Sequence, residues 1–137
     1  MNRGHRLLPH TADVRFEAWA PTREECLAEA AAALVAGFAD VTGVAARTTR
    51  TARLPGATDE DVLLALLDEI VYLLDTEDAV PLRAEVTGAA GDASVRLDLA
   101  PLDRVEVIGA APKAVSLHDL RFERATGGWW CTATVDV

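Results

Sequence analysis

Residues 10–20 carry the first clear pattern of the chain, because apolar and polar side chains alternate there from Val14 onward. The apolar positions point to one side, and Arg15 and Glu17 point to the other, which is the period of two expected of a half-buried strand. Trp19 falls on the polar side. We therefore expect a strand whose polar face is partly covered.

Two later segments repeat their apolar positions every three to four residues, which predicts helices. Thr22 and Glu25 have the spacing of a capping box and precede the first segment, whose pattern fades near Asp40. Thr58 and Asp61 open the second segment in the same way. Its apolar stripe consists of Val62, Leu63, Leu66, Leu67, Ile70, Val71, Leu73 and Leu74. A stripe this broad predicts a helix that is buried on more than one side.

Most of the remaining chain has the character of strands, and turn signals at residues 89–92 and at Gly127-Gly128 predict two hairpins. The expected strands cover residues 46–54, 81–88, 93–100, 103–108, 113–124 and 128–137. Because strands gather in the second half of the chain, we predict an α+β fold with two helices packed on one face of a mostly antiparallel sheet. The length of 137 residues fits one domain, which we assign to residues 1–137.

The composition, with 50% hydrophobic and 26% charged residues, excludes a disordered chain. No apolar run reaches the ~20 residues that cross a bilayer, and the first residues lack the apolar core of a signal peptide. Cys26 and Cys131 stand far apart, in no metal-binding or redox spacing. We expect them to be packing residues of a reduced, cytoplasmic protein without a membrane anchor.

The net charge of −9 disfavours direct binding of nucleic acid, because phosphate backbones repel an acidic surface. Acidic proteins of this kind more often meet metal ions or basic partners. Lys113 is the only lysine among 13 cationic residues. The preference for arginine is explained by codon bias, and a lysine retained under that bias suggests a position that requires a compact ammonium group.

Two aspartates occupy strand positions, where aspartate is depleted. Asp13 begins the first predicted strand, and Asp136 lies one residue before the end of the last one. Each alone is explained by a solvated strand end or an Asx turn. If the first and last strands lie side by side, however, Asp13, Asp136 and the terminal carboxylate of Val137 converge. Oxygen ligands of this kind suit a hard cation such as Ca²⁺ or Mg²⁺.

No nucleophile elbow, P-loop, dinucleotide fingerprint or HExxH motif is present in the sequence. His10, His118 and Asp119 stand beside strands, where hydrogen-bonded structural roles are commoner than metal ligation, and the lack of a His/Cys cluster argues against zinc. An acidic run at residues 75–78 follows the second helix, where negative charge is electrostatically unfavourable. This run is either a solvated loop or a functional loop, and the sequence does not decide between the two interpretations.

Several segments of the sequence match one known family: residues 10–14, Ala18-Trp19, the helix start at Thr22 and Glu25, residues 67–77, residues 113–120 and residues 135–137. With these segments, the sequence resembles the archease family, small acidic proteins that activate the tRNA-splicing RNA ligase of the RtcB type. Two departures are Ser116-Leu117, where the family usually has Thr-Tyr, and Asp68, where Asn is common. They affect the expected contact surface rather than the metal-binding pair.

The resemblance implies an archease-like α+β fold with a divalent-metal site, for which Ca²⁺ is the expected ion and Asp13, Asp136 and Val137 are the expected ligands. It also implies a functional role for Lys113. The implied function is that of a non-catalytic activator. The GTP-dependent ligase attaches guanylate to its own histidine and joins RNA ends in tRNA splicing or RNA repair, and the activator promotes that guanylylation and multiple turnover.

Two alternatives belong to other functional classes. A stand-alone metal-dependent hydrolase would use the same carboxylates, but three oxygen ligands and one lysine supply no evident nucleophile or general base. A chaperone-like binding module would carry the carboxylates as structural residues, with no role for a metal.

Overall fold

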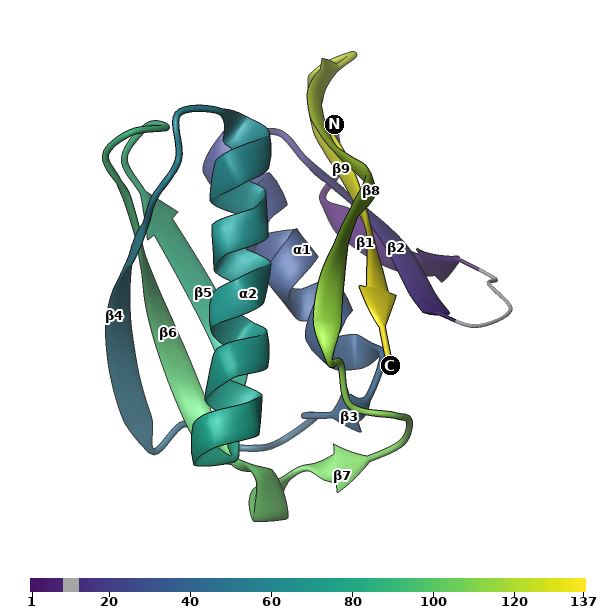
Figure 1. The fold of residues 1–137 in the computed structure, drawn as a ribbon, viewed down its shortest axis with the longest axis vertical. Helices are drawn as coiled ribbons and strands as arrows, with labels where there is room; N and C mark the ends of the chain where they lie inside the picture. The colour runs from purple at the N-terminus through teal and green to yellow at the C-terminus, as the bar shows by residue number, and fades with distance from the viewer. Residues whose placement is uncertain (9–12) are drawn as a thin grey trace.

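The computed structural model of the protein describes residues 1–8 and 13–137, so the candidate His10 lies outside the described residues. Figure 1 shows the arrangement of the helices and strands. In chain order these are β1 (Gly4–Leu8), β2 (Asp13–Ala20), α1 (Arg23–Ala36), β3 (Ala39–Asp40), β4 (Thr48–Leu54), α2 (Asp59–Glu77), β5 (Ala79–Thr87), β6 (Ala93–Pro101), a 3-10 turn (Leu102–Arg104), β7 (Glu106–Val107), β8 (Ala114–Ala125) and β9 (Gly128–Asp136).

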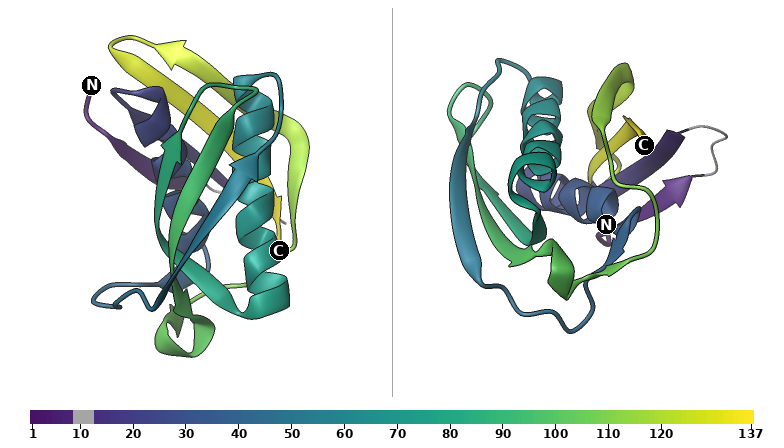
Figure 2. Two further views of the ribbon diagram at one scale, coloured as in Figure 1. Left: turned by 90° about the vertical axis from the view of Figure 1, so that its left-hand side faces the viewer. Right: turned by 60° about the horizontal axis from the view of Figure 1, so that its bottom comes forward.

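The described strands pair only in antiparallel fashion, in a four-stranded sheet β1-β2-β9-β8, a three-stranded sheet β4-β6-β5 and the short pair β3-β7. Helix α1 packs against β2 and β5, and α2 packs against β8 and β5, so the helices lie between the two larger sheets (Figures 1 and 2). The predicted α+β class, with two helices and mostly antiparallel strands, is confirmed. Hydrophobic alternation does not determine which strands pair, and the division into two sheets is therefore new information.

The apolar stripe of α2 is buried as predicted, because the helix has a sheet on either side. Leu63, Leu66, Leu67 and Ile70 are all fully buried. Packing of this kind stabilises the helix far more than its intrinsic propensity does. Among the described residues, none of the helices has the length and apolar character needed to cross a membrane.

Both cysteines are packing residues, as the sequence predicts. Cys26 of α1 and Cys131 of β9 are fully buried, with their sulfur atoms 3.8 Å apart. The contact with Cys26 and the burial of the thiol raise the pKa of Cys131. A buried thiol that stays protonated is a poor nucleophile and metal ligand, so this pair contributes packing rather than chemistry.

The two helix starts differ in how completely the capping box forms. At α2 the box is complete: the Asp61 N–H donates to the Thr58 hydroxyl over 3.1 Å, and the Thr58 N–H donates to the Asp61 carboxylate over 3.2 Å. At α1 the Glu25 N–H donates to the Thr22 hydroxyl, but the Glu25 carboxylate accepts from that same hydroxyl. The predicted box is thus half formed at α1, which still satisfies one amide of the first turn.

Strand β1 is an element that the sequence pattern does not predict, because five residues with two adjacent leucines show no sustained alternation. It pairs with β2 and covers part of the polar face there. Gly4 lies opposite Trp19, and the Arg6 guanidinium stacks over the Trp19 ring at 5.5 Å. The expectation that the polar side of β2 is partly covered is therefore confirmed.

The segment after β6 departs from its expected form. A strand over residues 103–108 is wrong for most of that length, because a 3-10 turn occupies Leu102–Arg104 and β7 covers only Glu106–Val107. In this turn the Val105 N–H donates to the Leu102 carbonyl over 3.3 Å. A short turn here lets the chain leave β6 and pair with β3, beside the lower end of α2 (Figure 1).

Candidate functional site

The two aspartates singled out in the sequence face each other across the paired strands β2 and β9. The antiparallel register places Asp13 directly opposite Asp136. Directly opposite residues have Cβ atoms about 4.5–5.5 Å apart and project from the same face of the sheet. Asp13 is partly buried and Asp136 is exposed. The first condition for a shared site, that these strands are neighbours, is thus met.

Lys113 and Val137 lie at the same end of the four-stranded sheet. The Lys113 N–H donates to the Asp136 carbonyl over 2.8 Å, and the next residue, Ala114, pairs with Asp136 in the register of β8 and β9. Val137 directly follows Asp136 at the end of β9. The fold therefore brings the four predicted site residues to the same end of the four-stranded sheet, although 100 positions separate Asp13 from Lys113 in the sequence.

The four residues nevertheless divide between the two faces of the sheet. Val135 is buried on the side of the helices, and successive residues of a strand alternate between faces, so Asp136 projects from the outer face. Lys113 and Val137 instead line a hollow of about 770 Å³ on the side of the helices. The paired aspartates and the hollow thus lie at the same end of the sheet but on its opposite faces.

The opposite wall of this hollow, which we call the Lys113 hollow, is the C-terminal end of α2. Tyr72, Asp75 and Asp78 line it there. The acidic run at residues 75–78 is therefore next to the predicted site, a proximity that the sequence does not predict. Two features of the sequence could have suggested this proximity. One is the acidic run at the end of the second helix, and the other is the single lysine, which directly precedes a strand.

The paired aspartates fit a hard divalent cation in the chemistry of their donors, because carboxylate oxygens are the ligands that Ca²⁺ prefers. Within residues 1–8 and 13–137, no group of three or more His, Cys, Asp or Glu side chains is placed to hold a metal ion. An ion at Asp13 and Asp136 would therefore need main-chain oxygen or water in addition. An oxygen of Val137, the residue after Asp136, is the predicted candidate for that ligand.

Arg15 is a neighbour of this pair that the predicted site does not include. It follows Asp13 by two positions on the same face of β2 and lies opposite Thr134 of β9. Its Nε atom is buried and has no hydrogen-bond partner among the described residues. The Asp-x-Arg spacing in a strand is the sequence signal that places the two side chains on one face.

His118 and Asp119 lie in an irregular part of β8, where the register against β9 shifts between Ser116 and Arg121. The His118 Nε2 is 3.4 Å from an Asp119 carboxylate oxygen, and Asp119 has a φ of 64°. The His118 side chain is 88% exposed. These two residues belong to an exposed bulge and are not part of a metal-binding cluster within the described chain.

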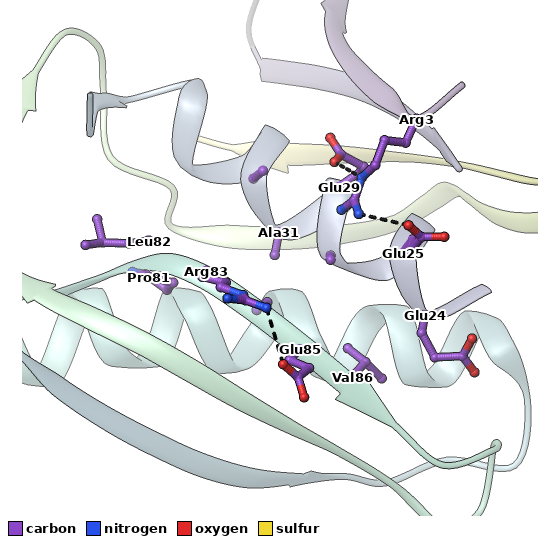
Figure 3. A pocket seen from close by; sticks show the side chains of 13 residues that line it. Arg3, Glu24, Glu25, Glu29, Ala31, Pro81, Leu82, Arg83, Glu85 and Val86 are labelled. Carbon is purple, nitrogen blue, oxygen red and sulfur yellow. Dashed lines mark hydrogen bonds and ion pairs between the residues drawn. The ribbon is translucent and has the colours of Figure 1, made fainter. Parts of the chain in front are cut away.

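A second hollow, of about 310 Å³, lies between α1 and β5 and is lined by none of the predicted site residues (Figure 3). Arg3 reaches across its rim to Glu29 at 2.6 Å and to Glu25 at 3.1 Å, as Figure 3 shows. Burial of the Glu29 carboxyl would raise its pKa, but hydrogen bonds from His5 and Arg3 outweigh this and hold the pKa below the ordinary value. These contacts tie β1 to α1, which is a structural role.

We expect Glu29→Gln to lower the free energy of unfolding by about 1 kcal/mol at pH 7, since it removes the negative charge and one of the two acceptor oxygens that contact Arg3 and His5. A carboxyl with a lowered pKa in the folded state stabilises the protein above its unfolded pKa and loses this effect as the pH falls. The difference from the wild type should therefore shrink as the pH falls below 4.5, the ordinary value for glutamate. Urea unfolding between pH 7 and pH 3 measures it. Glu24→Gln, in the same helix and hollow, is the control, and a difference that stays constant over this range would contradict the assignment.

Known proteins are similar in sequence to nearly the whole of this chain. Residues 5–137 match the model of the archease protein family. A probable protein archease of Mycobacterium tuberculosis is 42% identical over 134 residues, which cover 98% of this chain and 75% of the relative. Protein archease of Archaeoglobus fulgidus is 31% identical over 136 residues, which cover 97% of this chain and 98% of the relative.

Two solved structures share the fold. The solution structure of protein 1598 from Methanobacterium thermoautotrophicum superposes with a TM-score of 0.78 at 21% identity, covering 98% of this chain and 99% of that protein. The crystal structure of an archease from Thermotoga maritima, described as a possible chaperone, gives a TM-score of 0.65 at 21% identity, with 96% of each chain covered. The match of the family model over nearly the whole chain, supported by these relatives, shows that the protein belongs to the archease family.

Proposed function

We propose that this protein is a non-catalytic activator of a GTP-dependent RNA ligase of the RtcB type, acting in tRNA splicing or RNA repair in the cytoplasm. The observation that carries the proposal is the direct pairing of Asp13 with Asp136, with the Lys113 amide bonded to the Asp136 carbonyl. This geometry gathers the residues that the family resemblance implicates. Membership of the family supports the same role.

Asp13, Asp136 and an oxygen of Val137 would hold the divalent metal ion, for which Ca²⁺ is the expected species. The ion would supply positive charge close to phosphate oxygens. The carboxylates stand at the ends of the two central strands of the sheet, where they could enter the active site of a partner. Transfer of a phosphoryl-type group depends mainly on positioning and on neutralisation of charge, so a pre-formed carboxylate pair is suited to assist it.

Lys113 has a separate role in the proposal. Its side chain is exposed, and its backbone is anchored to Asp136 by the 2.8 Å hydrogen bond. A compact ammonium group at this position would contact the triphosphate of the GTP bound to the ligase. The net charge of −9 supports a basic partner rather than RNA as the direct contact.

A chaperone-like binding module is the second candidate. Exposed apolar side chains favour it, in particular Tyr72, Ile108 and Leu117, because such surfaces contact protein partners. The two functions differ in their need for a metal. A metal-dependent activator is stabilised against heat by Ca²⁺, since a ligand of the native state raises its stability, whereas a metal-free module is unaffected.

The test is an assay of the RNA ligase from the same organism, with and without this protein. Covalent guanylylation and the number of joined RNA products per ligase molecule are the two readouts. We expect faster guanylylation and many products per ligase when the protein is present. An active ligase whose guanylylation and product yield are unchanged by the protein would contradict the proposed function.

A further inference from the structure

The C-terminal end of α2 carries the wrong charge for a helix terminus. Its last turn has no basic residue, and Asp75 and the C-cap Asp78 add negative charge where the helix dipole is already negative. This placement costs stability, because cations are the favoured neighbours of a helix C-terminus. Asp78 also takes a left-handed backbone conformation, with a φ of 49°, which directs the chain into β5.

The acidic residues of this helix end differ in how they are neutralised. The Glu77 carboxylate is paired with the Arg50 guanidinium at 2.5 Å, which lowers the pKa of Glu77. For Asp75 and Asp78, no ion pair is formed with any cationic group among the described residues. Lys113, on the opposite wall of the Lys113 hollow, likewise forms no ion pair with a carboxylate of the described residues. Within residues 1–8 and 13–137, no cationic side chain therefore neutralises Asp75 or Asp78, and both carboxylates are exposed.

The hollow between these walls is mainly apolar inside. Phe38, Leu74 and Leu102 line it, together with Val107, which is 57% exposed. Tyr72 stands at its edge with 55% of its surface exposed. An apolar hollow with carboxylates and an aromatic ring at its edge suits a long basic side chain, whose stem packs on the apolar wall while the charged end reaches the acids.

We infer that the Lys113 hollow is a docking site for a lysine or arginine side chain of the RNA ligase, held by Asp75 and Asp78. The inference rests on the proposed function, since it takes the ligase as the partner. A protein that binds RNA presents basic residues around its active site, which gives the charge complementarity that the hollow requires. The hollow lies at the same end of the four-stranded sheet as Asp13 and Asp136, on the other face, so docking there would bring this end of the sheet to that active site.

Asp75→Asn and Asp78→Asn, singly and together, test this docking site. The amides keep the shape of the side chains and remove the charge. We expect the double variant to need about tenfold more protein for half-maximal stimulation of guanylylation, with the same rate at saturation, since it weakens binding alone. Its melting temperature should equal or exceed that of the wild type, because an unfavourable charge at the helix end is removed.

The matched control is Asp92→Asn, which removes the same charge from the turn between β5 and β6, at the other end of α2 (Figure 1). If the double variant and the control need the same concentration, the docking site is wrong while the proposed function stands. Loss of stimulation together with a lower melting temperature would show that the two aspartates are structural, which also overturns the inference. If the wild type neither binds nor stimulates the ligase, the proposed function itself fails.

Discussion

Replacing Asp13 or Asp136 by alanine is expected to abolish stimulation of the RNA ligase, with guanylylation falling to the rate of the ligase alone. The two carboxylates face each other across β2 and β9, so either substitution removes half of the pair that would hold the metal ion. Pre-organised groups that neutralise phosphate charge account for large rate effects, on the order of 10² or more for a single group. The measurement is guanylylation and multiple-turnover joining at saturating protein.

The same variants are expected to lose the stabilisation that Ca²⁺ gives to the wild type. A ligand present at 100 times its dissociation constant raises the free energy of unfolding by about 2.7 kcal/mol, which calorimetry detects as a higher melting temperature. Asp92→Ala, in an exposed turn, is the control. Normal stimulation by Asp13→Ala would exclude the metal pair as the centre of the activity.

Lys113→Ala separates the two roles within the site. Because Lys113 is not among the proposed metal ligands, this variant should keep the stabilisation by Ca²⁺ and lose stimulation. If Lys113→Ala lost both effects, the lysine would act through the metal site.

Phe16→Ala is expected to lower the free energy of unfolding by about 3–5 kcal/mol, because it leaves a large cavity in the core. Phe16 is fully buried on the face of β2 that packs against the helices. A loss of this size is a large part of the stability of an ordinary domain, which is about 5–15 kcal/mol. Urea or guanidinium unfolding with a linear extrapolation measures it.

Leu7→Ala is the matched control for this substitution. Leu7 lies directly opposite Phe16 in the register of β1 and β2, yet it is 44% exposed. Its truncation should cost about 1 kcal/mol or less, because little buried surface is lost. Equal losses for the two variants would contradict the placement of Phe16, and not Leu7, in the buried core.

The fold was predictable wherever local sequence controls local structure. The capping residues Thr22 and Thr58 are where the helices begin, and the broad stripe of α2 is buried as its width predicts. Strand β1 and the short β3 escaped prediction because their stability comes from partners distant in the sequence. Their own residues have no sustained period that would distinguish them from loops.

The candidate site was predictable only in part. Aspartate is depleted in strands, and this rule drew attention to Asp13 and Asp136. The pairing of β2 with β9 brought them together, as the hypothesis required. The rule gave no information about Arg15, nor about the placement of Asp75 and Asp78 across a hollow from Lys113.

The amino-acid sequence by itself determined the class of the fold, the two helices and the residues worth testing, because periodicity, capping and residue depletion are local properties of a chain. The tertiary structure alone decided how the strands divide between two sheets. It also decided on which face of the four-stranded sheet each candidate site residue lies. Strand pairing is set by contacts between distant segments and by their register. A shift of one residue moves every side chain to the other face. That register, which places Asp13 opposite Asp136 and leaves Val137 facing α2, decides which chemistry the surface can offer.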